Sequence, residues 1–91
     1  MAVTVRIPTQ LRELSGGAAE LSAQAGTVNE VLAQLDAAHP GFAERLFDDG
    51  GALRRFVNVF VADEDIRFLD GVETAVAPGQ VVSIVPAVAG G

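Results

Sequence analysis

A single stretch of helical periodicity most constrains the fold of this 91-residue chain. Its apolar residues recur at i, i+3, i+4 and i+7, which predicts one apolar stripe on a helix of about three turns, formed by Val28, Val31, Leu32 and Leu35. Thr27 and Glu30 have the spacing of a capping box at its start, and His39-Pro40-Gly41 ends it. One apolar helix face needs one sheet to cover it, so we expect a two-layer α+β domain.

The remaining apolar segments predict a sheet of four or five strands. Alternating or continuous apolar patterns bounded by Gly, Pro and Asp residues mark strands near 3–7, 19–23, 56–61, 66–68 and 80–85. Phe42 to Phe47 is expected to form a further helical turn. A chain of this length has room for one core, and we expect it to occupy residues 1–86 and to leave 87–91 as a flexible C-terminal tail.

The segment Phe56–Val61 is the strongest predicted strand, and its two faces differ. Val57, Val59 and Val61 share one face, which is expected to lie under the helix, and Phe56, Asn58 and Phe60 share the other. The pattern leaves open whether the two phenylalanines are covered by the 42–47 segment or form a partner-docking patch. Burial is favoured for Phe56, whereas both interpretations stay open for Phe60.

Composition excludes several classes of function. The net charge of −6 disfavours binding to nucleic acid or anionic lipid and favours a partner with a basic face. The chain has no cysteine, no long apolar run and no leader-like N-terminus, so we expect a soluble protein of the cytoplasm that does not enter a membrane. No metal site is predicted, because Asp48-Asp49 and Asp63-Glu64-Asp65 lack calcium-loop spacing and are read as solvated turns. His39 is interpreted as complementing the helix C-terminus, and Arg54-Arg55 as solvated charge.

Few side chains here are suited to covalent chemistry. The chain contains no cysteine, tyrosine or lysine and has one histidine and three serines. It ends in Gly90-Gly91 directly after the last predicted strand and Pro86, so the Gly91 carboxylate is the best candidate for a reacting group. Glycines without a Cβ atom let an extended tail enter a narrow cleft, and Val88 offers an apolar anchor beside Ala89.

These residues resemble a known family. The strand and tail Val82–Gly91, the order of elements and the segment Arg55–Phe68 are similar to the ThiS/MoaD family of ubiquitin-like sulfur carriers, and most similar to its actinobacterial cysteine-biosynthesis branch. The resemblance implies a β-grasp fold with a mixed sheet packed on one main helix. It also implies that the Gly91 carboxylate reacts and that Gly90, Ala89 and Val88 thread a partner's cleft. The docking role open to Phe60, with Asn58 beside it, follows instead from their place on the outer face of the 56–61 strand. Ala62 departs from the turn-forming Asn that many members carry.

The resemblance implies a role as a protein co-substrate, not as an enzyme. An E1-like adenylyltransferase would use ATP to activate Gly91 and a sulfur donor would convert it to a thiocarboxylate, while the carrier itself binds no cofactor. A pyridoxal-phosphate-dependent cysteine synthase would accept the sulfur, and a metallohydrolase would release the product. The free carrier is expected to be a monomer.

Four alternatives stay open at this stage. The chain is also compatible with the small subunit of molybdopterin synthase, with a thiamin or thiosugar sulfur carrier, with a ubiquitin-like modifier that forms amide conjugates, and with a plain binding module whose tail has no role. The sequence does not name the sulfur acceptor.

Overall fold

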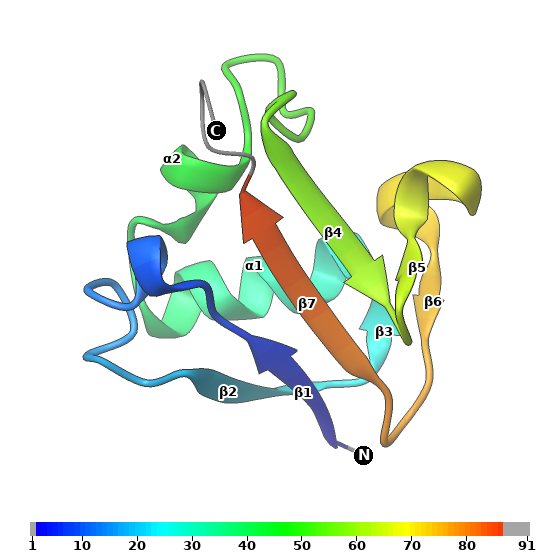
Figure 1. Cartoon of the computed structure of the whole chain (residues 1–91), viewed down its shortest axis with the longest axis horizontal. Helices are drawn as coiled ribbons and strands as arrows, with labels where there is room; N and C mark the ends of the chain where they lie inside the picture. Colours follow the sequence, from blue (N-terminus) through cyan, green and yellow to red (C-terminus); the bar gives the residue numbers. More distant parts are fainter. Residues whose placement is uncertain (1, 87–91) are drawn as a thin grey trace.

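The computed structural model describes residues 2–86, which form an α+β domain with its helices on one side of a mixed sheet (Figure 1). In chain order the elements are β1 (Ala2–Arg6), the 3₁₀ turn η1 (Thr9–Leu11), β2 (Glu20–Gln24), β3 (Gly26–Thr27), α1 (Val28–Ala38), α2 (Phe42–Leu46), β4 (Val57–Val61), β5 (Glu64–Asp65), the 3₁₀ turns η2 (Ile66–Phe68) and η3 (Gly71–Glu73), β6 (Ala75–Val76) and β7 (Val81–Pro86).

The main sheet has five strands in the order β2-β1-β7-β4-β5. The first and last strands, β1 and β7, lie side by side and parallel at its centre, with Val5 opposite Val82. The neighbouring pairs β1–β2, β4–β7 and β4–β5 are antiparallel. The prediction of a mixed sheet with four or five strands is therefore confirmed.

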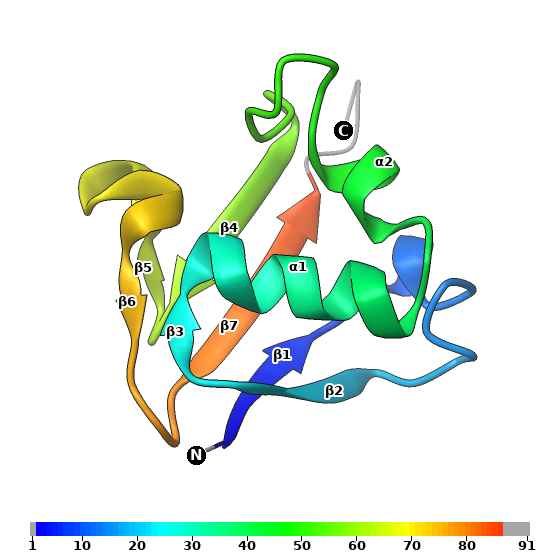
Figure 2. The same ribbon diagram turned by 180° about the vertical axis from the view of Figure 1, so that it is seen from behind.

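Helix α1 begins with the predicted capping box. The Glu30 amide donates to Thr27 Oγ1 over 3.2 Å, and the Thr27 amide donates to Glu30 Oε1 over 2.9 Å. The predicted stripe is buried along its whole length, at Val28, Val31, Leu32 and Leu35. Figure 2 shows α1 crossing the sheet on this side. The helix ends at Ala38, where the predicted His39-Pro40-Gly41 stop follows.

Helix α2 confirms the predicted helical turn and closes one end of the core. Phe42 and Leu46 are fully buried. Asp36 Oδ1 of α1 accepts hydrogen bonds from the Gly41 and Ala43 amides at 3.2 and 3.0 Å, which joins the two helices. Gly41 has φ +116°, and a Cβ there would lie 2.9 Å from Leu14 Cδ2, so this turn requires glycine.

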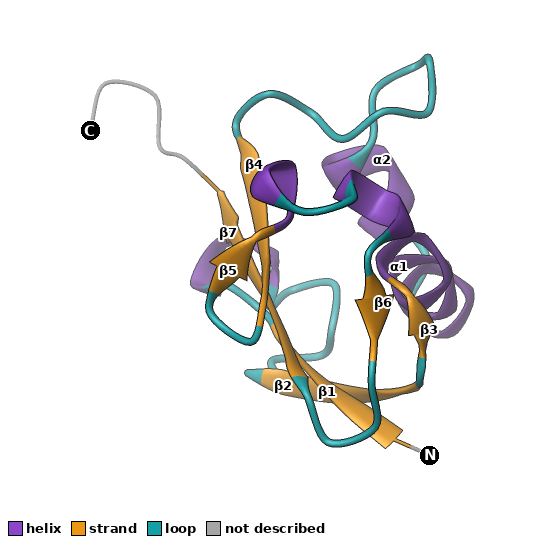
Figure 3. Ribbon diagram, turned by 90° about the vertical axis from the view of Figure 1, so that its right-hand side faces the viewer, coloured by secondary structure: helices purple, strands orange, loops and turns teal. Residues whose placement is uncertain are grey.

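The two faces of the sheet have different environments. Val57, Val59 and Val61 face α1 and are buried, as predicted. Figure 3 shows both α-helices on one side of the strands β4 and β7, whose opposite face carries no α-helix in the described chain. That uncovered face, with the end of β7, is where the candidate site lies.

The chain after β4 departs from prediction. The return strand is Glu64–Asp65, and Ile66–Phe68, predicted as a strand, forms the turn η2. The prediction was wrong because the Asp65 carboxylate accepts from the Arg67 amide at 2.9 Å, which caps a 3₁₀ turn in place of a strand ladder. The tight β4–β5 turn places Ala62 and Asp63 at φ 51° and 71°.

A second small sheet was not predicted. Gly26–Thr27 of β3 pairs with Ala75–Val76 of β6 in antiparallel register. Two-residue strands carry too little pattern to be recognised in a sequence. This pair ties the start of α1 to the segment before β7, and the Val28 amide donates to the Thr74 carbonyl at 2.9 Å.

Candidate functional site

The last strand ends beside a groove. Pro86, the final residue of β7, lies opposite Val57 of β4, at the end of the sheet nearest α2 (Figure 1). The adjacent groove has a volume of about 440 Å³ and is lined by Gln10, Leu11, Glu44, Arg45, Arg54, Phe56, Val57 and Pro86. Four lining residues are apolar and four are polar or charged, which suits an extended peptide or an apolar side chain from a partner.

The structure does not describe the predicted tail residues. Val88, Ala89, Gly90 and Gly91 lie outside the described residues, as does the predicted boundary of a tail at 87–91. What the structure establishes is the position of the last described residue, Pro86. It follows a strand buried at Val82 and Ile84, so the segment after it starts from a fixed point on the sheet.

The uncovered face of the sheet carries the two predicted docking residues. Asn58 and Phe60 of β4 point to this face and are half-buried, opposite Val85 and Ser83 of β7. Val85 is 46% exposed. The structure therefore brings Asn58, Phe60 and Val85 together as a shallow patch of mixed polarity.

The burial favoured for Phe56 is wrong. Phe56 is 51% exposed, because β4 begins only at Val57 and Phe56 sits in the turn before it, at the rim of the groove. Arg54, interpreted as solvated charge, is half-buried. Its guanidinium donates to the Glu44 carbonyl through Nε at 3.1 Å and Nη2 at 2.9 Å, which holds the segment before β4 against α2.

A charged network joins the uncovered face of the sheet to the η2 turn. Arg67 donates through Nη2 to Asn58 Oδ1 and to Asp65 Oδ2, the latter at 3.0 Å, and through Nε to Asp65 Oδ1 at 3.3 Å. The hydrogen bonds from Arg67 hold the pKa of Asp65 below its usual value, and the same bonds raise the pKa of Arg67. Asn58 is therefore a structural partner of Arg67 as well as a surface residue.

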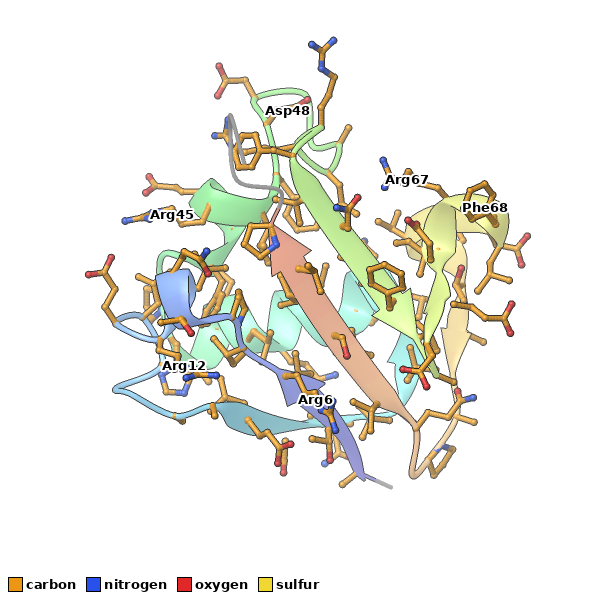
Figure 4. All side chains as sticks on the ribbon, in the orientation of Figure 1. Arg6, Arg12, Arg45, Asp48, Arg67 and Phe68 are labelled. Carbon is orange, nitrogen blue, oxygen red and sulfur yellow. The ribbon has the colours of Figure 1, made fainter. Side chains whose placement is uncertain are left out.

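The sequence reasoning missed the most exposed apolar side chain among those the structure identifies. Phe68 is 86% exposed and its neighbour Leu69 is 41% exposed. Figure 4 labels Phe68 and Arg67 at the η2 turn, on the opposite edge of the molecule from Arg45 of α2. The prediction of a strand over 66–68 gave no reason to expect this exposure. Asp65 was the signal for a turn, because aspartate often caps a helical turn by accepting from the amide two residues later, here that of Arg67.

The other sequence candidates are structural or exposed. The ring of His39 meets Phe42 edge-on, with 6.4 Å between centroids, so His39 lies at the end of α1 against the core. Within residues 2–86 the acidic and histidine side chains form no group of three that could hold a metal ion. None of the helices in that range has the length and apolar character needed to cross a membrane.

Comparison with known proteins decides the family. The model of the ThiS family matches residues 5–91, which is nearly the whole chain and includes its last residue. The chain belongs to the ThiS family. It is 50% identical to the sulfur carrier protein CysO of Mycobacterium tuberculosis, and the alignment covers 100% of both chains.

Solved structures of this family share the fold. CysO in the Amycolatopsis orientalis BexX/CysO complex matches with a TM-score of 0.91 and 45% identity over 98% of this chain and 99% of that chain. The small archaeal modifier protein SAMP1 of Haloferax volcanii matches with a TM-score of 0.84 and 26% identity over 100% of both chains. These neighbours confirm the predicted ubiquitin-like β-grasp fold and the predicted resemblance to sulfur carriers.

Proposed function

We propose that this protein is a sulfur carrier whose reacting group is the Gly91 carboxylate. The observation that carries the proposal is the ThiS family match, which extends through Gly91, on a domain whose last strand ends at Pro86. The body supplies recognition and partner enzymes supply the catalysis, so the carrier acts as a co-substrate. Because activation consumes ATP held by the partner, the carrier needs no cofactor of its own, and we place it in the cytoplasm.

The chemistry needs activation because a carboxylate is a poor electrophile. The Gly91 carboxylate oxygen attacks the α-phosphorus of ATP, which forms an acyl-adenylate and releases pyrophosphate. A sulfide-level sulfur then attacks the acyl carbon, the C–O bond to AMP breaks, and AMP leaves. The product is a C-terminal thiocarboxylate, a polarizable sulfur nucleophile that does not diffuse as free sulfide does.

The tail and the body have separate tasks in this proposal. Gly90 and Gly91 allow close approach to a partner's reactive centre, while Val88 and Ala89 occupy the entry cleft. The fixed φ of Pro86 reduces the entropy lost when the tail is bound. The proposed docking face includes Phe60 and Asn58, which lie on the uncovered side of the sheet.

Cysteine biosynthesis is the sulfur-accepting pathway favoured by the 50% identity to CysO. In that pathway the thiocarboxylate sulfur would bond to the β-carbon of an activated serine derivative held by a pyridoxal-phosphate synthase, and the activated oxygen substituent of that carbon would leave. A metallohydrolase then cleaves the new cysteine from Gly91. The complex of the Amycolatopsis relative with BexX supports the view that this carrier also acts by docking to a partner protein.

Intact-mass spectrometry tests the proposal directly. After incubation with the cognate adenylyltransferase, ATP and a sulfur donor, the carrier should gain the mass difference between one sulfur and one oxygen. A chain lacking Gly91 should show no gain while its circular dichroism and unfolding curve stay unchanged. The proposal would be overturned if the full chain gained no mass with an adenylyltransferase and a sulfur donor that convert another carrier of this family to its thiocarboxylate.

The docking face has its own test. Phe60→Ala should weaken adenylyltransferase binding and leave most of the unfolding free energy in place, because Phe60 is only half-buried. A large loss of stability would assign Phe60 to the core. Asn58→Ala is less selective, because it also removes the acceptor of Arg67.

A ubiquitin-like modifier is the second candidate function, favoured by the fold match to SAMP1 of Haloferax volcanii. In that case the adenylated Gly91 would be attacked by a lysine amine of another protein, with loss of AMP and formation of an amide. Gly91-dependent adducts of higher mass on cell proteins would support this role. A stoichiometric large partner on purification would instead support a molybdopterin-synthase-like subunit.

A further inference from the structure

We propose that Phe68 is the main aromatic anchor by which the adenylating enzyme recognises the body of this carrier. The inference rests on the proposed function and specifies the partner's surface: an apolar pocket rimmed by lysine and arginine. Four observations carry it, namely exposure, fixation, charge and position.

The Phe68 side chain is exposed to water and contributes little to the core. Its exposed fraction of 86% exceeds that of Phe56, at 51%, and that of Leu69, at 41%. Burying an aromatic ring is among the larger favourable contributions to a protein interface, and such anchors cluster where binding energy is concentrated. Together Phe68 and Leu69 form what we call the η2 knob.

The knob is held in place before any partner arrives. Ile66, at the start of η2, is 2% exposed and anchors the turn in the core. The Leu69 amide donates to the Ile66 carbonyl at 3.0 Å, and Arg67 is bonded to both Asp65 and Asn58. On the far side, the Asp70 amide donates to Thr74 Oγ1 at 3.1 Å. A pre-formed turn loses little conformational entropy on binding, which favours affinity.

The charges around the knob define the partner. The segment 63–73 contains five carboxylates and one arginine, so it carries a net charge of −4 out of −6 for the whole chain. Four of these carboxylates are exposed: Asp63, Glu64, Asp70 and Glu73. Such a rim repels an anionic lipid surface and a second copy of the same segment. It attracts a basic rim, and it speeds encounter at low ionic strength.

The position of the knob explains why a tail-modifying enzyme would use it. The tail after Pro86 offers Ala87, Val88, Ala89, Gly90 and Gly91, and valine is its largest side chain. An enzyme that must select this carboxylate among many protein C-termini therefore needs a second recognition site, on the folded domain. The knob lies at the β5 edge of the sheet, across β4 from the end of β7, so it can be held while the tail reaches elsewhere (Figure 4).

Binding is best measured with a chain lacking Gly91 and without ATP, because no carboxylate can then be adenylated. In calorimetric titration against the cognate adenylyltransferase, Phe68→Ala should raise Kd by about tenfold or more. The urea unfolding midpoint should stay close to that of the parent chain, because the ring is exposed. Phe68→Leu should recover part of the affinity, and Asp70→Asn with Glu73→Gln should weaken the salt dependence of binding.

Arg67 is a positioning residue for the knob, and a double-mutant cycle tests that role. Arg67→Gln should raise Kd in the parent chain and speed hydrogen exchange of the Leu69 amide. In the Phe68→Ala background the same change should have little further effect on Kd. Equal effects in both backgrounds would mean that Arg67 contacts the partner independently.

Several results would overturn the proposal. One is a Kd for Phe68→Ala within twofold of the parent value; another is an absence of binding by the chain lacking Gly91. A dimer in sedimentation velocity that Phe68→Ala dissociates would assign the knob to self-association. Failure of the proposed function would give a different result: the full-length carrier would bind the enzyme in calorimetry but would gain no sulfur in the intact-mass experiment.

Discussion

The two faces of the five-stranded sheet differ in burial, although the same strands contribute side chains to both. On the covered face, Val57, Val59 and Val61 meet α1 and are buried. On the uncovered face, Asn58, Phe60 and Val85 are half-buried or exposed, and the η2 knob extends this face beyond β5. The buried core therefore lies on one face of the sheet, and the recognition surface that we propose lies on the other.

The largest expected effect comes from a matched pair of phenylalanines. Phe42→Ala on the covered side should lower the unfolding free energy by about 3–5 kcal/mol, because the ring is fully buried and its removal leaves a cavity. Phe56→Ala, the same change at a half-exposed ring, should cost much less. Urea denaturation of both variants measures the contrast. Similar losses in the two variants would contradict the burial that the structure gives to the two rings.

A smaller effect is expected at the start of α1. Thr27→Ala removes the acceptor for the Glu30 amide and should cost about 1 kcal/mol. The thiocarboxylate yield should stay unchanged, because α1 covers the inner face only. Thr9→Ala, at an exposed threonine of η1, is the matched control. If folded Thr27→Ala gave a lower thiocarboxylate yield, the start of α1 would also take part in partner recognition.

A stabilising substitution is available at Ala62, in the turn between β4 and β5. Its φ of 51° is left-handed, a conformation that costs alanine roughly 1 kcal/mol and that asparagine adopts more readily. Ala62→Asn should therefore raise the unfolding free energy by up to about 1 kcal/mol. The same substitution at Ala33, an exposed residue in the middle of α1, should instead lower it, because asparagine is a poorer helix former than alanine.

The smallest effect concerns the charge network of the uncovered side. Because the pKa of Asp65 is lowered in the folded state, its pairing with Arg67 contributes stability above the ordinary pKa of 3.8. This contribution is lost as the pH falls through the lower folded-state value. Carbon-13 NMR of the Asp65 carboxyl should show the depressed pKa, and Arg67→Gln should return it toward 3.8. An unchanged pKa in that variant would remove Arg67 as the cause.

Much of the fold was predictable because local signals and burial agreed. The Thr27–Glu30 capping box and the stripe from Val28 to Leu35 lie where predicted, since one apolar helix face is specified by residue spacing alone. The alternation from Val57 to Val61 likewise identified the buried side of β4. The prediction failed at Ile66–Phe68, where a side-chain cap from Asp65 outweighed the strand propensity of the segment.

The sequence by itself determined the two-layer fold and the resemblance to the family, and it is the source of the proposed reacting end. Gly90-Gly91, the scarcity of nucleophilic side chains and the helical stripe are all properties of residue order. Only the tertiary structure decided which apolar side chains stay in water. Phe56 and Phe68 have the same chemistry as Phe42, and their exposure depends on where β4 starts and how η2 turns. Burial is a property of the neighbours that folding brings from distant segments, and residue type alone does not specify those neighbours.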